Sequence, residues 1–491
     1  MNFAIEPFRR RLGPILALML AVALISSCAT NPVTGKHELA LISEAQEIDL
    51  GRQSDRQVVA TIGLYPDEHL QQYVQSLGTK LAAASERPNL PWTFRVVDDA
   101  SVNAFALPGG FVYVTRGIMA HLNSEAELVS VMGHEIGHVT ARHSVSQMSK
   151  QQLAGLGLNL AMVFLPEARP YGDIASQGLG LMFLKFSRTD EAQADDLGLK
   201  YLVQAGYDPR PMTEVFELLE RVSQASSAGR LPQWLASHPD PSRRRETIGG
   251  EIAALNHDWS GRPVARDAYL QRIDGMVFGN DPRDGFVEGS TFYHPALAFQ
   301  MRFPDGWKIQ NEKQVVAAMS PNQDAILALS LSNAGSPNEA ARQFFSQEGV
   351  QQGQAWRDEI GGMNAASYAF AATTQQGQLS GLASWVTHRG KVYQILGYTL
   401  ADRARNYSNA ITGSIASFDG VSDRRILEVQ PRRVDVVKLQ RGESLEGFVR
   451  DYPSSVPPET VALVNNLGSG ASLHAGEAYK RITGGPGRGE S

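Results

Sequence analysis

The sequence predicts an α+β protein with more than one domain, and three observations lead to this prediction. With 491 residues, of which 43% are hydrophobic and 20% charged, the chain can bury a large core and is long enough for roughly two to four domains. Over about the first 255 residues, apolar side chains recur mainly at helical spacing. Further along, short alternating runs typical of strands dominate. We therefore expect a mainly helical first domain with a small antiparallel sheet, followed by domains richer in strand.

Residues 1–27 are typical of a targeting segment. Three arginines, Arg9 to Arg11, precede an apolar run at 15–25 (ILALMLAVALI) that is short for a membrane-spanning helix. The run leads into LISSC, and Cys28 is the only cysteine of the chain. This ending resembles a bacterial lipobox, which implies a signal peptide over 1–27 and a lipid on Cys28. With Ala29 next, the resemblance implies an anchor in the outer membrane, facing the periplasm. The alternatives are an ordinary signal peptide with an unrelated Cys28, or an uncleaved anchor.

The first domain is expected over residues 28–262 and begins with two helices and a sheet. Apolar residues recur every three or four positions over 43–84, interrupted by the turn GLYPD at 63–67. The alternating run WTFRVVDD at 92–99 and the segment NAFALPGGFVYVTRG at 103–117 follow. Because the Gly-Gly pair separates two apolar runs, these segments predict the small antiparallel sheet.

The next part of the domain is expected to be helical. Ser124 and Glu127 form the Ser-x-x-Glu pattern of a capping box, which predicts a long helix running through Met148. The Gly-rich apolar stretch 153–184 is interpreted as a pair of buried core helices, with a mobile lid or a membrane-facing hairpin as the alternative. Further helices are expected at 187–206, at 212–222 and, after a loop with the sequence LASHPDPSRRR at 235–245, up to about residue 255.

Two more domains follow in the prediction. Residues 285–420 form an α+β domain of unknown role, with helices near 337–347 and 403–417 among several alternating runs. The pattern of residues 430–483 predicts the order strand, helix, helix, strand.

The formal net charge of the chain is −6, and both signs are dispersed without a long basic run. We therefore do not expect nucleic acid as a partner.

The pentapeptide HEIGH at 134–138 is the strongest chemical signal. Each residue of an α-helix advances by about 100°, so His134 and His138 lie one above the other and can reach one metal ion. Glu135 is rotated to the side, where it can contact a metal-bound water without being a ligand. A catalytic zinc normally has three protein ligands and one open position. The third ligand must therefore come from another segment.

The best source of a third ligand is SRTDEAQADDLG at 187–198. Glu191 and Asp195 are four positions apart and so share one face of the next long helix. Glu191 can bind the metal, and Asp195 can hold a ligand histidine through a hydrogen bond. The alternative, a solvated acidic face near a helix N-terminus, would be favoured if the segment stood alone.

These motifs together carry a family resemblance. HEIGH, SRTDEAQAD, the upstream NAFALPGG and the downstream SHPDPSRR resemble the membrane-associated gluzincin metalloendopeptidases of the CAAX prenyl endopeptidase, HtpX and beta-barrel assembly-enhancing protease type. The resemblance implies a zincin-type fold with one zinc ion per chain, and Glu135 as the general base. It implies zinc ligands His134, His138 and Glu191, supported by Asp195.

The resemblance also gives roles to two other segments. His238 matches the histidine of the family's His-Pro motif, which implies either stabilisation of the oxyanion or a fourth zinc ligand in a resting state. The segment Asn103, Ala104, Phe105 and Ala106 is similar to the family's edge strand, on which an extended substrate pairs. Arg188 is assigned only a structural pairing. His143, on the same predicted helix as His138 but about 140° away, is interpreted as a structural or surface residue.

The C-terminal runs VVKLQRGESL, LVNNL and LHAGEAYKRI resemble a LysM module. A contact with peptidoglycan, a contact with protein and a purely structural role are the alternatives for this segment. The leading hypothesis is a lipid-anchored zinc metalloendopeptidase that hydrolyses peptide bonds in unfolded, misfolded or misassembled envelope proteins. The alternative is an envelope assembly factor or chaperone that uses the same fold, and the C-terminal segment, mainly for binding.

Overall fold

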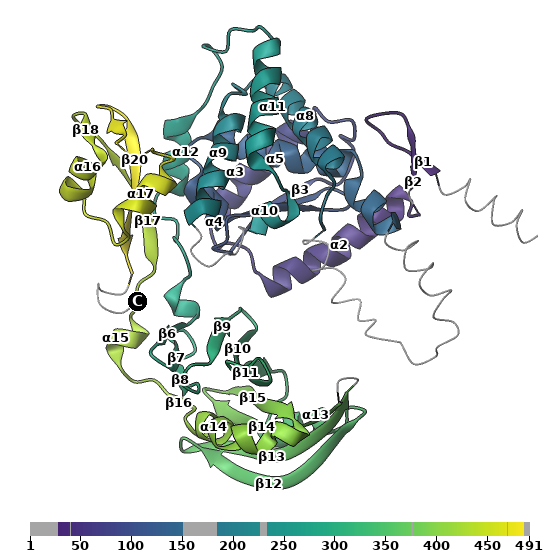
Figure 1. The fold of residues 1–491 in the computed structure, drawn as a ribbon, viewed down its shortest axis with the longest axis vertical. Coiled ribbons are helices and arrows are strands. Elements are labelled where there is room, and N and C mark those ends of the chain that lie inside the picture. Colours follow the sequence, from purple (N-terminus) through teal and green to yellow (C-terminus); the bar gives the residue numbers. More distant parts are fainter. Residues whose placement is uncertain are drawn as a thin grey trace, which may run out of the picture. The chain divides into compact units, whose positions relative to one another are not determined.

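The computed structural model describes residues 28–39, 41–150, 184–225, 233–374, 377–468 and 470–485. The chain divides into two compact units, residues 1–279 with 434–482, and residues 280–433 with 483–491. Most helices belong to the first unit and the largest sheet to the second (Figure 1). The predicted α+β class is confirmed. Within the described part of the chain, no helix combines the length and the apolar composition that a membrane span requires.

The first unit begins with a short hairpin, two helices and a mixed sheet. Its elements are β1 (Cys28–Thr30), β2 (His37–Leu39), α2 (Glu44–Thr61), α3 (Glu68–Ala82), β3 (Thr93–Val97), β4 (Ala104–Leu107) and β5 (Phe111–Thr115). The two predicted helices are confirmed, and the side chains of Ser43 and Asp67 cap their N-termini. The prediction of an antiparallel sheet is wrong in part. The order is β3-β5-β4, so β5 pairs antiparallel with β4 but parallel with β3, and alternation along a strand does not encode that order.

Seven helices follow in the described part of this unit: α4 (Arg116–His121), α5 (Glu125–Thr140), α8 (Arg188–Gln204), α9 (Pro211–Ala225), α10 (Gln233–Ser237), α11 (Pro241–Ala254) and α12 (Arg266–Ile273). Helix α5 is buried on all sides and packs on α8. A Cβ atom added to Gly137 would lie 2.9 Å from the Ala194 carbonyl oxygen, and one on Gly133 would lie 3.3 Å from that of Gly198. The two glycines therefore allow α5 and α8 to approach closely, which outweighs their poor helix propensity.

Two helix boundaries differ from the prediction. The helix that starts after Ser124 ends at Thr140, not at Met148, because Arg142 adopts a left-handed conformation with φ of 59°. The Arg142 side chain donates hydrogen bonds to Glu47 and to the Ile42 carbonyl, so a tertiary contact holds the break. In the predicted loop 235–245, the structure forms α10 and the start of α11. The predicted helices at 153–184 lie outside the described residues, which resume at Leu184.

The second unit has two antiparallel sheets. The order of the larger sheet is β12-β13-β14-β15-β11-β10-β9 and that of the smaller is β16-β8-β7-β6. Trp385 and Val386 are adjacent in β14 but join different apolar clusters, one with α13 and one with α14, so helices cover both faces. The strands are β6 (Phe286–Glu288), β7 (Thr291–His294), β8 (Phe299–Arg302), β9 (Lys308–Asn311), β10 (Val315–Met319), β11 (Ala325–Ser332), β12 (Val350–Ile360), β13 (Met363–Thr374), β14 (Gly377–His388), β15 (Lys391–Leu400) and β16 (Asp419–Gly420), and the helices are α13 (Pro337–Phe345), α14 (Ala404–Ala416) and α15 (Arg424–Leu427).

The segment 434–482, which we name the C-terminal module, belongs to the first unit. Its strands are β17 (Arg432–Lys438), β18 (Glu443–Ser444), β19 (Ser472–Leu473) and β20 (Ala478–Gly484), and its helices are α16 (Leu445–Asp451) and α17 (Pro458–Val464). The predicted order of strand, helix, helix and strand is therefore present, with β17 pairing with β20. Phe448 and Ile482 of the module share one apolar core with Leu270 of α12. Helix α17 also contacts α4 and α9 (Figure 1).

Candidate metal centre

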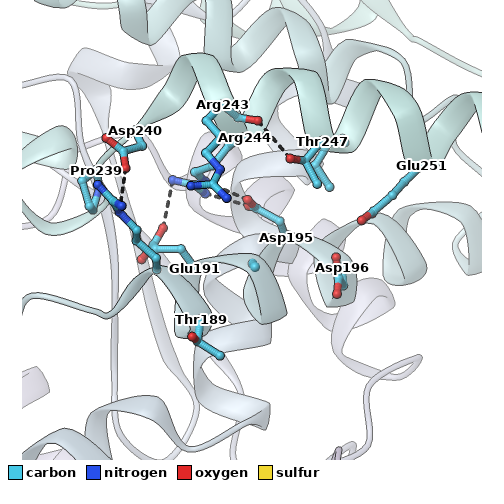
Figure 2. A pocket seen from close by; sticks show the side chains of 13 residues that line it. Thr189, Glu191, Asp195, Asp196, Pro239, Asp240, Arg243, Arg244, Thr247 and Glu251 are labelled. Carbon is cyan, nitrogen blue, oxygen red and sulfur yellow. Dashed lines mark hydrogen bonds and ion pairs between the residues drawn. The ribbon is translucent and has the colours of Figure 1, made fainter.

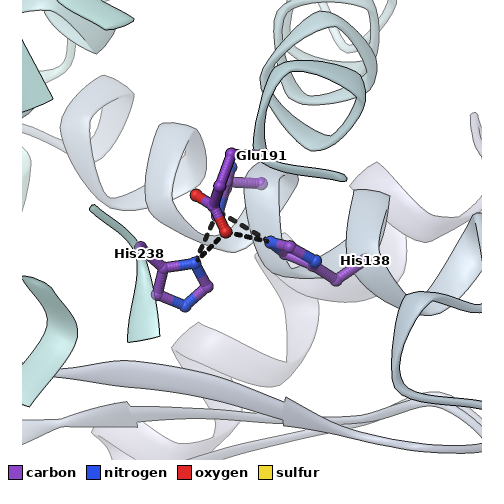
Figure 3. Close-up of side chains that lie close together, drawn as sticks. His138, Glu191 and His238 are labelled. Carbon is purple, nitrogen blue, oxygen red and sulfur yellow. Dashed lines mark hydrogen bonds and ion pairs between the residues drawn. The ribbon is translucent and has the colours of Figure 1, made fainter. Parts of the chain in front are cut away.

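Four buried side chains from three segments meet beside the α5–α8 contact. Helix α5 contributes His134 and His138, α8 contributes Glu191, and the turn between α10 and α11 contributes His238. One ligand atom from each lies within 4.8 Å of all the others. Figure 3 shows His138, Glu191 and His238 turned toward one another from different elements. Among the described residues, no other group of this kind is found.

The donor atoms are spaced as ligands of one ion. Nε2 of His134 lies 3.0 Å from Nε2 of His138 and 3.6 Å from Oε2 of Glu191. Nε2 of His138 lies 3.5 Å from Oε1 of Glu191. Ligands held tetrahedrally about 2.0 Å from zinc are about 3.3 Å apart. These separations are close to that value, and all of these donor atoms belong to buried side chains. The residues therefore fit a zinc ion.

The far side of His134 is held by charged groups. Its Nδ1 lies 2.9 Å from Oδ1 of Asp195, so the ring donates there and directs the Nε2 lone pair toward the other ligands. Arg244 of α11 donates two hydrogen bonds to the Asp195 carboxylate, of 2.6 and 2.7 Å. Its Nη1 also lies 2.9 Å from Oε2 of Glu191. Figure 2 shows the Arg244 guanidinium between these two carboxylates, beside a pocket between α8 and α11.

The electrostatics keep both carboxylates of this group ionised. Burial raises the pKa of Asp195, but the charge and hydrogen bonds of Arg244 and the hydrogen bond from His134 lower it more. Burial also raises the pKa of Glu191, and the charge of His238 together with hydrogen bonds from the surrounding histidines lowers it well below its ordinary range. The cluster therefore presents anionic oxygen to a cation at any ordinary pH.

The far side of His138 is held by His143, which is a buried structural residue and not one of the four clustered side chains, but which lies beside His138 and not about 140° away from it. Nδ1 of His143 lies 2.9 Å from Nδ1 of His138, and its Nε2 lies 2.9 Å from Oε1 of Gln193. The amide oxygen accepts from Nε2–H of His143, whose Nδ1 then accepts from Nδ1–H of His138. This order of donors leaves the His138 Nε2 lone pair free for a metal. A straight helix would point His143 away, but the break at Arg142 returns it to the site.

Glu135 has the geometry of a proton acceptor. Its side chain is buried, and Oε1 has no hydrogen-bond partner in the described part of the protein. The nearest charged neighbour in the site is Nε2 of His238, at 3.6 Å. A buried carboxylate oxygen without a partner is costly unless a water molecule or a substrate uses it. The arrangement suits a base that acts on a water molecule beside the ligands.

His238 lies within the cluster. Its Nδ1 is 2.9 Å from Oε1 of Glu191 and 3.3 Å from Nε2 of His134. The ring stacks on Trp234, with centroids 4.7 Å apart, and is close to Phe186. Burial lowers the pKa of His238, but the negative charge and hydrogen bond of Glu191 outweigh this and raise it. Both alternatives for this residue require such proximity to the ligands.

Arg244 was not singled out in the sequence, although a signal was present. Residues Arg244, Ile248 and Ile252 are spaced by four and form the buried face of α11. This spacing distinguishes Arg244 from its neighbours Arg243 and Arg245 in the run of three arginines. For His143 we find no comparable signal, because its position depends on the backbone break.

The remaining predicted residues lie as follows. Asn103 directly precedes β4, and Ala104–Ala106 lie in β4, an outer strand of the described sheet that contacts α5. Arg188 forms a largely exposed ion pair with Asp240, with Nε and Oδ2 3.0 Å apart, which is consistent with structural pairing. Cys28 lies in β1, and its side chain is outside the described part.

Comparison with known proteins finds a family match for one part of the chain. Residues 68–252 match the model described as Peptidase family M48. This part of the chain is a peptidase family M48 region. All four residues of the metal cluster lie inside the matched M48 region, so the resemblance drawn from the motifs is confirmed. The C-terminal module and the second unit lie outside that region.

Individual proteins are also similar to this chain. The chain is 32% identical over 234 residues to the beta-barrel assembly-enhancing protease of Escherichia coli K12, covering 46% of this chain and 47% of that one. It is 30% identical over 243 residues to the putative beta-barrel assembly-enhancing protease of Vibrio cholerae, covering 47% and 50%. It is 31% identical over 212 residues to the mitochondrial metalloendopeptidase OMA1 of Arabidopsis thaliana, covering 43% and 41%. The chain thus spans about half the length of the curated relatives it matches.

Proposed function

We propose that this M48 protein is a zinc metalloendopeptidase of the bacterial cell envelope. The observation that carries the proposal is the buried set of two histidines and one glutamate, next to a second glutamate with an unpartnered oxygen. The match of residues 68–252 to peptidase family M48 and the similarity to two named metallopeptidase groups support it. A protein that only binds clients has no need of this second glutamate, which argues against the assembly-factor alternative.

The chemistry follows from the residues of the site. Zinc held by His134, His138 and Glu191 would lower the pKa of a bound water and polarise a substrate carbonyl. Oε1 of Glu135 accepts the proton of the attacking water and then passes it to the leaving amine. Asp195 keeps the His134 ring in the tautomer that offers Nε2 inward.

For His238 we favour the role of fourth ligand in a resting state. Its Nδ1 lies at ligand distance from the other donor atoms, whereas Nε2 approaches Glu135. A substrate carbonyl would then require His238 to leave its place, after which the same ring can donate a hydrogen bond to the developing oxyanion. The two alternatives from the sequence thus become successive states of one residue.

The proposal extends to location and substrate. We propose cleavage of signal peptide 1–27, a lipid on Cys28, and a place on the periplasmic face of the outer membrane. The substrates are unfolded or misassembled envelope proteins, whose extended segments would pair with the edge strand at Asn103–Ala106. The names of the bacterial relatives, which refer to assembly of β-barrels, support a role in envelope quality control. Mass spectrometry of the N-terminal peptide tests the anchor, because an unmodified Cys28 would contradict it.

The decisive variant is Glu135→Gln. It keeps the shape of the side chain but removes the base, so we expect zinc content equal to that of the parent and a loss of peptide hydrolysis of at least about 100-fold. Metal analysis and cleavage of an unfolded reporter protein measure the two. Full rescue by Glu135→Gln of the defect of a strain lacking the protein would instead favour the assembly-factor alternative. Clients retained by this variant and identified by mass spectrometry would give the substrates.

A further inference from the structure

One lysine of the C-terminal module is buried inside the M48 part of the first unit. Lys480 of β20 has no exposed surface, and its Nζ donates to the carbonyl oxygens of Ala120, at 2.9 Å, and Leu122, at 2.7 Å. A buried amine is costly unless its hydrogen bonds are satisfied. The burial lowers the pKa of Lys480 far below its ordinary value. Burying a lysine at this position costs more free energy than burying an apolar residue would. The contacts that its Nζ makes therefore indicate what the residue does there.

The two carbonyls that Lys480 contacts belong to the end of a helix. Helix α4 ends at His121, and Leu122 is its C-terminal cap. The last carbonyls of a helix have no partner within the helix and need an outside donor. Only two residues later, Ser124 caps the N-terminus of α5, the helix that carries His134. Lys480 therefore holds the turn from which the metal-binding helix starts.

The same turn is tied down from two other directions. The backbone N–H of Asn123 donates to Oε2 of Glu127 at 2.7 Å, which reaches back from the first turn of α5. Arg266 of α12 donates both to the Asn123 carbonyl, at 3.4 Å, and to the Ala478 carbonyl of the module, at 3.0 Å. Its guanidinium also lies 5.6 Å from the ring centre of Tyr479. The module, α12 and the start of α5 thus form one bonded group.

The module is also joined to the rest of the first unit through its backbone and its core. Val434 of β17 exchanges backbone hydrogen bonds of 2.8 Å with Gly275 and Met276. At the other end of the module, the side-chain amide of Asn466 donates to the Glu214 carbonyl in α9 at 3.4 Å. These contacts, with the shared apolar core, are those of a domain interior and differ from those of a module on a free linker.

We propose that the C-terminal module is an integral part of the peptidase domain, in which Lys480 acts as a positioning residue for the metal-binding helix α5. The inference rests on the proposed function for its catalytic readout. Glu127 and His134 are seven residues apart on α5, about 10 Å along the axis, and the helix is buried throughout. A displacement of the first turn therefore moves the ligand pair rather than bending the helix. This role does not require the module to bind glycan.

The test compares two lysine substitutions in the full-length protein. Lys480→Met keeps an unbranched side chain of similar length but removes the donor to Ala120 and Leu122. The control is Lys438→Met, also in the module, where the 3.7 Å ion pair of Lys438 with Asp267 of α12 is exposed on both sides. An exposed pair contributes little, so the control should behave like the parent.

We expect three changes for Lys480→Met and none for Lys438→Met. Amide hydrogen exchange in the first two turns of α5 accelerates, and zinc affinity, measured by competition with a chelator, falls about tenfold. At a temperature where circular dichroism shows the protein folded, kcat falls about tenfold or more, while KM changes less than about twofold. A purely structural lysine would lower the melting temperature and leave all three quantities of the folded protein unchanged, which would overturn the proposal.

A second variant decides the matter where Lys480→Met does not fold. Arg266→Met removes the other donor to the turn, from a half-buried position on α12. We expect the same three changes with smaller size, and unchanged exchange in α5 would overturn the proposal. Exchange and zinc affinity do not depend on catalysis. A parent protein without peptidase activity would therefore contradict the proposed function and still allow Lys480 to be judged.

Discussion

The two sides of the metal centre hold their histidines by different means. Behind His134 stand an ionised carboxylate and a guanidinium, Asp195 and Arg244, in direct contact. Behind His138 stand an imidazole and an amide, His143 and Gln193, and a carboxylate oxygen of Asp190 lies 3.9 Å from the imidazole. Both arrangements select the same ring tautomer, but only the first places a carboxylate in direct contact with the ligand histidine. The difference suggests that charge raises metal affinity on one side, while the other side supplies orientation alone.

The largest expected effect comes from removing the charged side. Asp195→Ala leaves Arg244 buried without its main partner, so we expect the metal-free protein to lose about 3–5 kcal/mol of unfolding free energy. Zinc affinity should fall toward 100-fold, the upper end for loss of such a partner. Chemical denaturation and chelator competition measure the two. Unchanged zinc affinity in a folded variant would show that Asp195 does not act on the ligand.

A smaller effect is expected from the side of the centre where His143 and Gln193 hold His138. His143→Phe keeps a ring of similar size but removes the acceptor for Nδ1–H of His138, so zinc affinity should fall about tenfold. Stability should change less than in Asp195→Ala, because no charge is left unpaired. His69→Phe, at an exposed histidine of α3, is the matched control. Equal losses for His143→Phe and Asp195→Ala would remove the distinction between the two sides.

The smallest expected effect is a pH dependence of stability. It differs between His138 and Asp195, which stand on different sides of the metal centre. The pKa of His138 in the metal-free protein is well below 6.5, and burial of the ring is the largest cause. Its contribution to stability is therefore present above pH 6.5 and is lost as the pH falls, since the unfolded chain then binds the proton. The pKa of Asp195 lies below 3.8, so its contribution is lost only in more acidic solution.

The measurement is the difference in melting temperature between the metal-free parent and a metal-free variant. We expect the advantage of the parent over His138→Gln to shrink between pH 7 and pH 5. Over the same range, the advantage over Asp195→Ala should stay constant. A constant difference for His138→Gln would mean that folding leaves the pKa of this ring unchanged, and a difference that grows toward pH 5 would mean that the ring is protonated in the folded protein.

Much of the fold followed from local pattern. The helices at 44–61 and 188–204 and the N-terminus of α5 were predicted because amphipathic spacing and caps lie within a few residues of each other. The failures have a common cause. The parallel pairing of β3 with β5 and the end of α5 at Thr140 depend on partners far along the chain.

By itself, the sequence determined the chemistry at the centre of the site. The spacing of four puts His134 above His138 and Glu191 above Asp195, because an α-helix returns to the same face after about four residues. Only the tertiary structure decided what surrounds these pairs. Arg142 breaks α5 through a contact with Glu47, which returns His143 to the site. Lys480, from a segment more than 300 residues beyond α5, reaches the turn before it. Such contacts join distant residues, and no periodicity along the chain encodes them.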